Sequence, residues 1–205
     1  MDSRIQENAS RALTQVLDLR PGETFLAVTD DATLEVGEGF RAAAAALGAQ
    51  AHLYLLPESA RPLTELPEDL AQLIPDTDVA VTCFSGRPAE TPFRIALIRE
   101  LVRVVRRLGH APGITTSMMV DGPMSVDYAQ MALTAHALMR RFEGATKAHL
   151  TAPGGTDLHV DLADRPFATD AEILDGKWGN LPAGEIWCAP VEDTAQGISG
   201  TTRGG

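Results

Sequence analysis

The chain has 205 residues, of which 44% are hydrophobic and 22% charged, so it is long enough for one large domain or for one domain and part of a second. Its net charge of −11 argues against nucleic acid and against an anionic membrane surface as partners, because both attract clustered lysine and arginine. The N-terminus has no apolar signal segment and no apolar run approaches roughly 20 residues, so the sequence predicts a cytoplasmic protein.

Strand and helix patterns alternate through the first two thirds of the chain. Helical spacing of apolar residues predicts helices over 5–19, 34–47, 91–108 and 125–142, with a shorter one over 66–74. Short apolar runs bounded by turn residues predict strands over 24–29, 51–56, 78–84 and 113–116. This alternation predicts an α/β fold, a Rossmann-like parallel sheet flanked by helices, in a domain over residues 1–143.

The long helix expected over 91–108 carries many cations. We expect them to cover its solvated face instead of forming a phosphate site: Arg94, Arg99, Arg103, Arg106 and Arg107. Cys83 and Cys188 lie far apart and form no C-x-x-C motif, so each is expected to be a small buried hydrophobe.

The pattern changes after Gly144. Two strands, over 146–151 and 156–162, flank the turn sequence Ala-Pro-Gly-Gly and predict a hairpin. Residues 144–205 therefore form a partial β-rich second region. The small polar residues of 197–205 predict a disordered tail.

The strand over 157–162 alternates apolar and polar residues. Asp157, His159 and Asp161 share one face, and two carboxylates beside an imidazole are metal-ligand types. Positions two apart are about 6.6 Å apart along the backbone, which makes convergence on one ion difficult. A solvated polar face is the favoured interpretation, and a metal site is the alternative.

A second candidate is Glu185, which follows the turn residues Pro182 and Gly184 and opens the apolar run Ile-Trp-Cys-Ala. A carboxylate at the mouth of a buried strand is costly unless it is paired or bound to metal. From these residues alone, a metal ligand and a turn carboxylate bonded to backbone N–H groups are equally good interpretations. Glu192 and Asp193 add negative charge nearby.

Other catalytic patterns are missing from the sequence. Ser85 does not stand in a G-x-S-x-G motif, and there is no dinucleotide-binding or P-loop glycine motif. Four histidines have no metal-ligand spacing: His52, His110, His136 and His149. His136 lies on an apolar helix face and is expected to be structural.

One motif resembles a known family. The segment from Asn180 to Gly197 is similar to the N-L-P-x-G-E-[VI]-x-x-A-P-x-E-x-[TS]-x-x-G signature of the aminopeptidase T family, also called thermophilic metallo-aminopeptidases. The opening helix, the segment from Leu19 to Glu23 and the Gly-Thr-Asp-Leu sequence at 155–158 also resemble that family. The resemblance extends over nearly the whole chain, but only the motif at 179–197 is specific.

The resemblance implies a two-metal exopeptidase, a hydrolase that removes N-terminal residues from short peptides. Glu185 would be a metal ligand, with Asn180, Glu192 and Asp193 as site neighbours and zinc, cobalt, manganese or iron as the divalent metal. The family's other ligands would lie beyond Gly205, so this chain is expected to be truncated and incomplete as a catalyst.

Two alternatives remain open. A related branch, the ring-opening dihydroxypyridine dioxygenases, uses mononuclear iron and a small-molecule substrate. The second alternative is a non-catalytic scaffold derived from the family. In that case an exposed apolar face on the incomplete β region would favour a homodimer.

Overall fold

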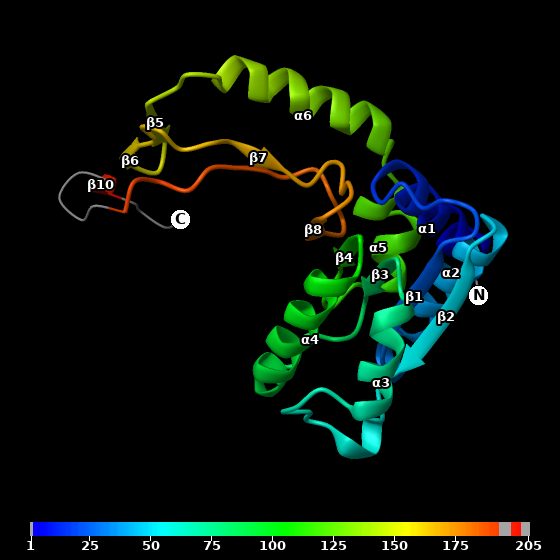
Figure 1. The fold of residues 1–205 in the computed structure, drawn as a ribbon. Helices are drawn as coiled ribbons and strands as arrows, with labels where there is room; N and C mark the ends of the chain where they lie inside the picture. Colours follow the sequence, from blue (N-terminus) through cyan, green and yellow to red (C-terminus); the bar gives the residue numbers. More distant parts are fainter. Residues whose placement is uncertain (1, 193–197, 202–205) are drawn as a thin grey trace. The chain divides into compact units, whose positions relative to one another are not determined.

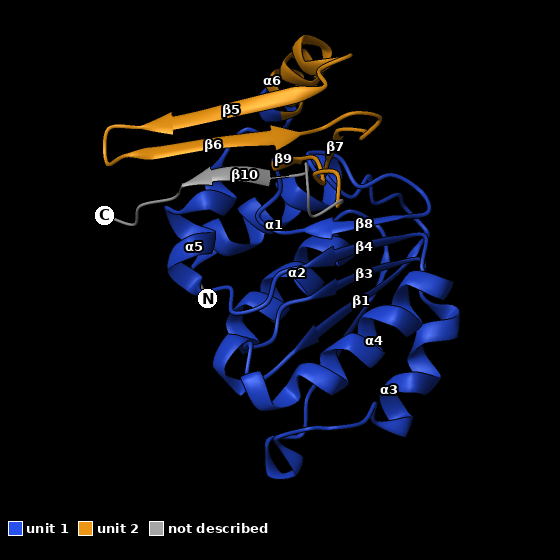
Figure 2. Cartoon of the chain, turned by 90° about the vertical axis from the view of Figure 1, so that its left-hand side faces the viewer, with its two compact units in different colours: residues 1–131, 170–184 blue, residues 132–169, 185–205 orange. Residues whose placement is uncertain are grey.

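The computed structural model describes residues 2–192 and 198–201 (Figure 1). Contacts divide the chain into two compact units, residues 1–131 with 170–184 and residues 132–169 with 185–205 (Figure 2). The first unit is thus completed by a segment that returns to it from late in the sequence. The α/β class predicted from the sequence is confirmed: a parallel sheet flanked by helices is accompanied by a small antiparallel β region.

The first unit is built on a five-stranded parallel sheet in the order β2-β1-β3-β4-β8. Its strands are β1 (Thr24–Thr29), β2 (Gln50–Leu55), β3 (Val79–Thr82), β4 (Arg107–His110) and β8 (Lys177–Asn180). The helices are α1 (Ser3–Gln15), α2 (Leu34–Ala46), α3 (Glu68–Leu73), α4 (Thr91–Val104) and α5 (Thr116–Val120). Single 3₁₀ turns cover Asp31–Thr33, Glu58–Ala60, Ile74–Asp76, Pro88–Glu90 and Pro123–Ser125.

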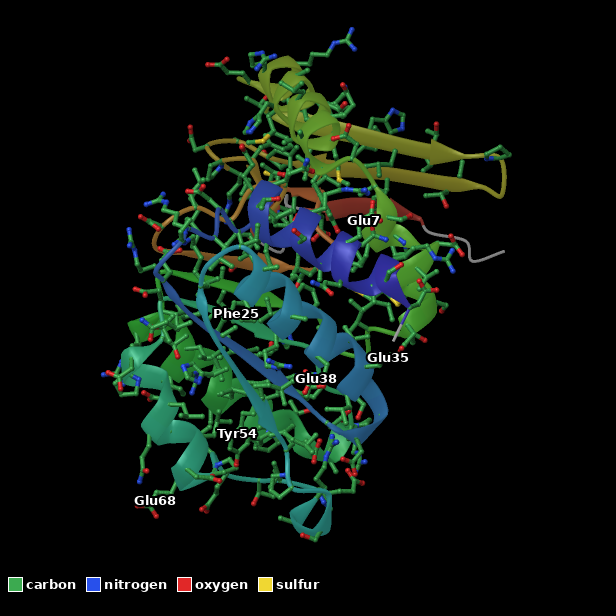
Figure 3. The ribbon with its side chains drawn as sticks, turned by 90° about the vertical axis from the view of Figure 1, so that its right-hand side faces the viewer. Glu7, Phe25, Glu35, Glu38, Tyr54 and Glu68 are labelled. Carbon is green, nitrogen blue, oxygen red and sulfur yellow. The ribbon has the colours of Figure 1, made fainter. Side chains whose placement is uncertain are left out.

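Both faces of this sheet are buried, which explains the continuous apolar runs of its strands. Phe25 and Ala27 of β1 pack on the side of α1 and α2, while Leu26 and Val28 pack on the side of α3 and α4. Figure 2 shows the helices in these two layers, and Figure 3 shows Phe25 and Tyr54 on neighbouring strands with Glu68 at the outer surface. The order of the strands is that of a doubly wound sheet, whose topological switch point lies between β1 and β3.

Local sequence signals bound two of these helices. The carboxylate of Asp2 accepts a hydrogen bond from the N–H of Arg4 and caps α1. Gly48 follows α2 with φ of +86°, a conformation that favours glycine at a helix C-terminus.

The fourth strand differs from the prediction. Residues 107–110 form β4 and not the end of a helix, and residues 113–116 form no strand, because Thr116 begins α5. Helix α4 ends where Val105 turns to extended backbone, and Arg107 then pairs in parallel register with Val79. Arg107 is fully buried, so the expectation that it covers a solvated helix face is wrong.

A buried ion cluster explains the position of Arg107. Its guanidinium donates to the carboxylate of Glu23 and lies 3.2 Å from a carboxylate oxygen of Asp175 and 3.7 Å from one of Asp18. These partners come from segments far away in the sequence. Strand pairing and these charge partners hold Arg107 at a position that the helical periodicity through it does not predict.

The second unit contains a three-stranded antiparallel sheet in the order β10-β6-β5 and the two-stranded pair β7-β9. The strands are β5 (Lys147–Ala152), β6 (Thr156–Asp161), β7 (Ala168–Thr169), β9 (Ile186–Trp187) and β10 (Ile198–Thr201), and helix α6 (Tyr128–Phe142) leads into them. The predicted hairpin is confirmed as β5 and β6. In the predicted disordered tail, residues 198–201 instead pair with β6, and residues 197 and 202–205 lie outside the described part.

No helix among the described residues is long and apolar enough to cross a membrane.

Candidate metal-binding sites

The turn that precedes Glu185 is held by one buried carboxylate. Asp170, which is 3% exposed, accepts hydrogen bonds from the N–H of Asn180 (3.2 Å) and the N–H of Gly184 (2.9 Å). The N–H of Leu181 donates to the carbonyl of His110 on the neighbouring strand (2.9 Å). The Asn-Leu-Pro-Ala-Gly segment is therefore fixed to the first unit at the carboxyl end of β8.

Close packing around the turn requires glycine at two positions of the motif. A Cβ on Gly179 would lie 2.7 Å from the Cβ of Asp170, so only glycine lets this carboxylate approach the strand. Gly184 has φ of +117°, and a Cβ there would lie 1.8 Å from the sulfur of Met131. The motif thus encodes a tightly packed turn that includes a cis peptide bond between Leu181 and Pro182.

Glu185 follows this turn with an exposed side chain, and its carbonyl accepts a hydrogen bond from Thr169 Oγ1 (2.6 Å). The strand after it is short and half-exposed, with Trp187 44% exposed, so the expected buried Ile-Trp-Cys-Ala strand is wrong. In the described residues, Glu185 belongs to no group of three or more candidate metal ligands. Further ligands for Glu185 would have to come from elsewhere.

The other predicted neighbours of Glu185 remain expectations. Asn180 and Glu192 have exposed side chains. Asp193 lies outside the described residues.

The structure does bring a different group of ligand types together. His149 on β5 and Asp157 and His159 on β6 have side-chain nitrogen or oxygen atoms that all lie within 4.8 Å of one another. Among the sequence candidates this group contains Asp157 and His159 but not Asp161. The carboxylate of Asp161 instead accepts from the N–H of Ala163 (2.9 Å) in the turn that follows β6.

His149 had no ligand spacing in the sequence. The signal that could have found it is the hairpin register, because Ala152 pairs with Thr156 across the tight turn and this places His149 opposite His159.

The carboxyl ends of β1 and β3, where doubly wound proteins commonly bind ligands, are occupied by a buried ion network. Arg61 donates to both Asp30 and Glu90, and the hydroxyl and the N–H of Ser85 donate to Asp30. Burial raises the pKa of Asp30, but hydrogen bonds from Ser85, Arg61 and Thr33 outweigh it and lower this pKa to about 2. An ionised carboxylate neutralised in this way acts as a structural partner and not as a general base.

His110, at the carboxyl end of β4, is also structural. Burial, with a smaller contribution from the charge of Arg94, lowers the pKa of His110 to about 4, and its Nδ1 lies 2.6 Å from Thr82 Oγ1. It is therefore neutral near pH 7. Cys83 is buried as expected, whereas Cys188 is only half-buried, and both thiols are free.

Comparison with known proteins gives a fold relationship. The sequence matches no protein-family model and no curated protein. The structure is similar to AmpT from Thermus thermophilus, with a TM-score of 0.64, 15% identity, and coverage of 96% of this chain and 63% of that one. It is also similar to 2,5-dihydroxypyridine dioxygenase from Pseudomonas putida KT2440, with a TM-score of 0.62, 13% identity, and coverage of 93% and 56%.

These identities show a shared fold and not a shared activity. This chain spans less than two thirds of either neighbour's length, since it covers 63% and 56% of them.

Proposed function

We propose that this chain is a metal-dependent aminopeptidase-like protein in which Glu185 is a metal ligand. The observation that supports this most is the Asp170-bonded turn, which packs the Asn180–Gly184 segment tightly and ends at an exposed carboxylate. The AmpT neighbour carries the name of the family whose motif the turn sequence resembles. The family that the motif resembles implies a divalent metal at Glu185.

In this proposal the chain contributes a positioned ligand. Asp170 accepts hydrogen bonds from the backbone N–H groups of Asn180 and Gly184, so the turn immediately before Glu185 is ordered before any metal binds. Preorganisation of a ligand lowers the entropic cost of binding. The remaining ligands are supplied from outside the described residues. A bound divalent metal would supply a water of lowered pKa for attack on the first peptide bond of a short peptide.

Hydrolysis tests the proposal directly. We expect the chain, supplied in turn with zinc, cobalt, manganese and iron(II), to release the first residue of a leucyl peptide only weakly, because most of the metal ligands lie outside the described residues. The same peptide with an acetylated N-terminus should give no release. Glu185→Ala should abolish the release, whereas Glu65→Ala, a change of another exposed glutamate in a loop, should keep it. Release that survives Glu185→Ala would contradict the role of Glu185.

A second candidate is dioxygenase chemistry, favoured by the comparable likeness to the dihydroxypyridine dioxygenase. Under this alternative, iron(II) and 2,5-dihydroxypyridine would give oxygen uptake that zinc does not support. Uptake without any peptide hydrolysis would select this candidate over the first.

A further inference from the structure

Three metal-ligating side chains gather on one face of the β5–β6 hairpin, away in sequence from the turn at Glu185. The turn around Gly155, where φ is +98°, sets a register in which His149 lies opposite His159 and Thr151 lies opposite Asp157. Residues directly opposite on paired strands share a face, and diagonal neighbours remain within reach of long side chains. The pairing therefore delivers two imidazoles and one carboxylate to the same patch.

The side chains in this patch point at one another. His149 Nε2 lies 2.7 Å and His159 Nε2 3.6 Å from the same oxygen of Asp157. The two rings are stacked with centroids 4.0 Å apart and an angle of 12° between their planes. Same-face positions along one strand are widely spaced. Here the ligand atoms still come close, because side chains from two strands converge on one oxygen of Asp157.

This geometry is close to that of a coordination sphere. Metal–nitrogen and metal–oxygen bonds of about 2.0–2.2 Å place neighbouring ligands of a tetrahedral ion roughly 3.3–3.5 Å apart. The ligand atoms here already lie within 4.8 Å of one another, so rotation about side-chain bonds suffices to reach that spacing. The side chains are 51–64% exposed, which leaves them free to rotate and open to ions from solvent.

We propose that His149, Asp157 and His159 bind one divalent transition-metal ion, with water in the remaining positions. Imidazole nitrogen favours zinc, copper, nickel and cobalt over calcium and magnesium, which prefer oxygen ligands. The bound ion joins β5 to β6 and stabilises the hairpin. The site uses neither Glu185 nor any residue of the turn before it, so it stands independently of the aminopeptidase-like function.

Titration of the whole chain with zinc in an isothermal calorimeter tests this site. We expect His149→Ala and His159→Ala each to weaken the same binding event by more than about 100-fold, since even outer partners of metal ligands are worth about 10–100-fold. His52→Ala is the matched control, because His52 is an exposed histidine on β2 that belongs to no such group among the described residues. Glu185→Ala should leave this event unchanged.

Cobalt(II) gives a second readout that does not depend on affinity. Its visible absorption reports nitrogen and oxygen ligands in a four- or five-coordinate site, and Asp157→Asn should change that spectrum while circular dichroism shows the chain folded. Zinc that binds equally to wild type, His149→Ala and His159→Ala would overturn the proposal, as would a wild-type chain that binds no zinc at micromolar concentration.

Discussion

At the scale of single residues, Asp170 determines the local geometry of the candidate motif. Its two oxygens accept from the N–H groups of Asn180 and Gly184, and its Cβ lies where a side chain at Gly179 would stand. The motif alone gives no reason for Gly179, since Asp170, the residue that requires it, lies nine positions earlier. Asp170 was not among the residues that sequence reasoning selected.

Replacement of Asp170 should loosen this turn. Hydrogen bonds to charged groups contribute about 1.5–3 kcal/mol each, and their loss would leave two backbone donors without this acceptor. We therefore expect Asp170→Ala to lower the free energy of unfolding in urea by about 3 kcal/mol. Asp76→Ala, a change of an exposed aspartate, should alter it by less than about 0.5 kcal/mol. Equal effects of the two changes would contradict the structural role of Asp170.

The buried network at Asp30 predicts an acid-sensitive contribution to stability. The pKa of Asp30 is about 2 in the folded chain and about 3.9 in an unfolded one, so the contribution is present above pH 4 and is lost as the pH falls towards 2. Thermal unfolding between pH 2 and pH 5 should show a shallower pH dependence for Asp30→Asn than for wild type. The neighbouring exposed Asp31→Asn should keep the wild-type slope, and a wild-type slope in Asp30→Asn would refute the assignment.

At the scale of elements, the sequence predicted most helices and strands of the first unit but not β4, α5 or β8. Val104, Val105 and Leu108 continue an apolar helical stripe, and nothing local distinguishes Arg107 from the solvated arginines before it. The structure buries Arg107 against Glu23, which lies 84 positions away. Information of that range is not contained in a local pattern.

Arg107 should accordingly contribute far more to the stability of the fold than the arginines of α4. Arg107→Met leaves Glu23 buried without this partner, and removal of one member of a buried ion pair costs about 3–5 kcal/mol. Arg103→Met breaks an ion pair to Glu100 in which the arginine side chain is 74% exposed, and it should cost less than about 1 kcal/mol. Chemical denaturation of both variants compares them, and similar losses would show that the Arg107 cluster contributes little.

The candidate metal site on the hairpin also depends on contacts that a local sequence pattern does not contain. Alternation along residues 157–161 correctly placed Asp157 and His159 on the exposed face. The partner His149 depends on pairing across the turn, which spacing along one strand does not reveal. Asp161 satisfied the alternation but serves the turn after β6.

At the scale of the whole molecule, the α/β architecture was predictable because alternating strands and helices leave few topologies. The membership of β8 was not predictable, since its four residues lie beyond the hairpin and return to the edge of the parallel sheet. The homodimer expected from an exposed apolar face remains our proposal. Light scattering would test it, with twice the 21.8 kDa chain mass as the expected result and a single chain as the contrary one.

The metal content of the purified chain tests the central claim most directly. It should be measured by elemental analysis in the His159→Ala background, so that the hairpin site does not contribute, with and without Glu185→Ala. Our account predicts about one divalent ion per chain, or more, in His159→Ala. It predicts that this metal is lost in the double variant. Equal metal content in both proteins, or none in either, would contradict a metal site at Glu185.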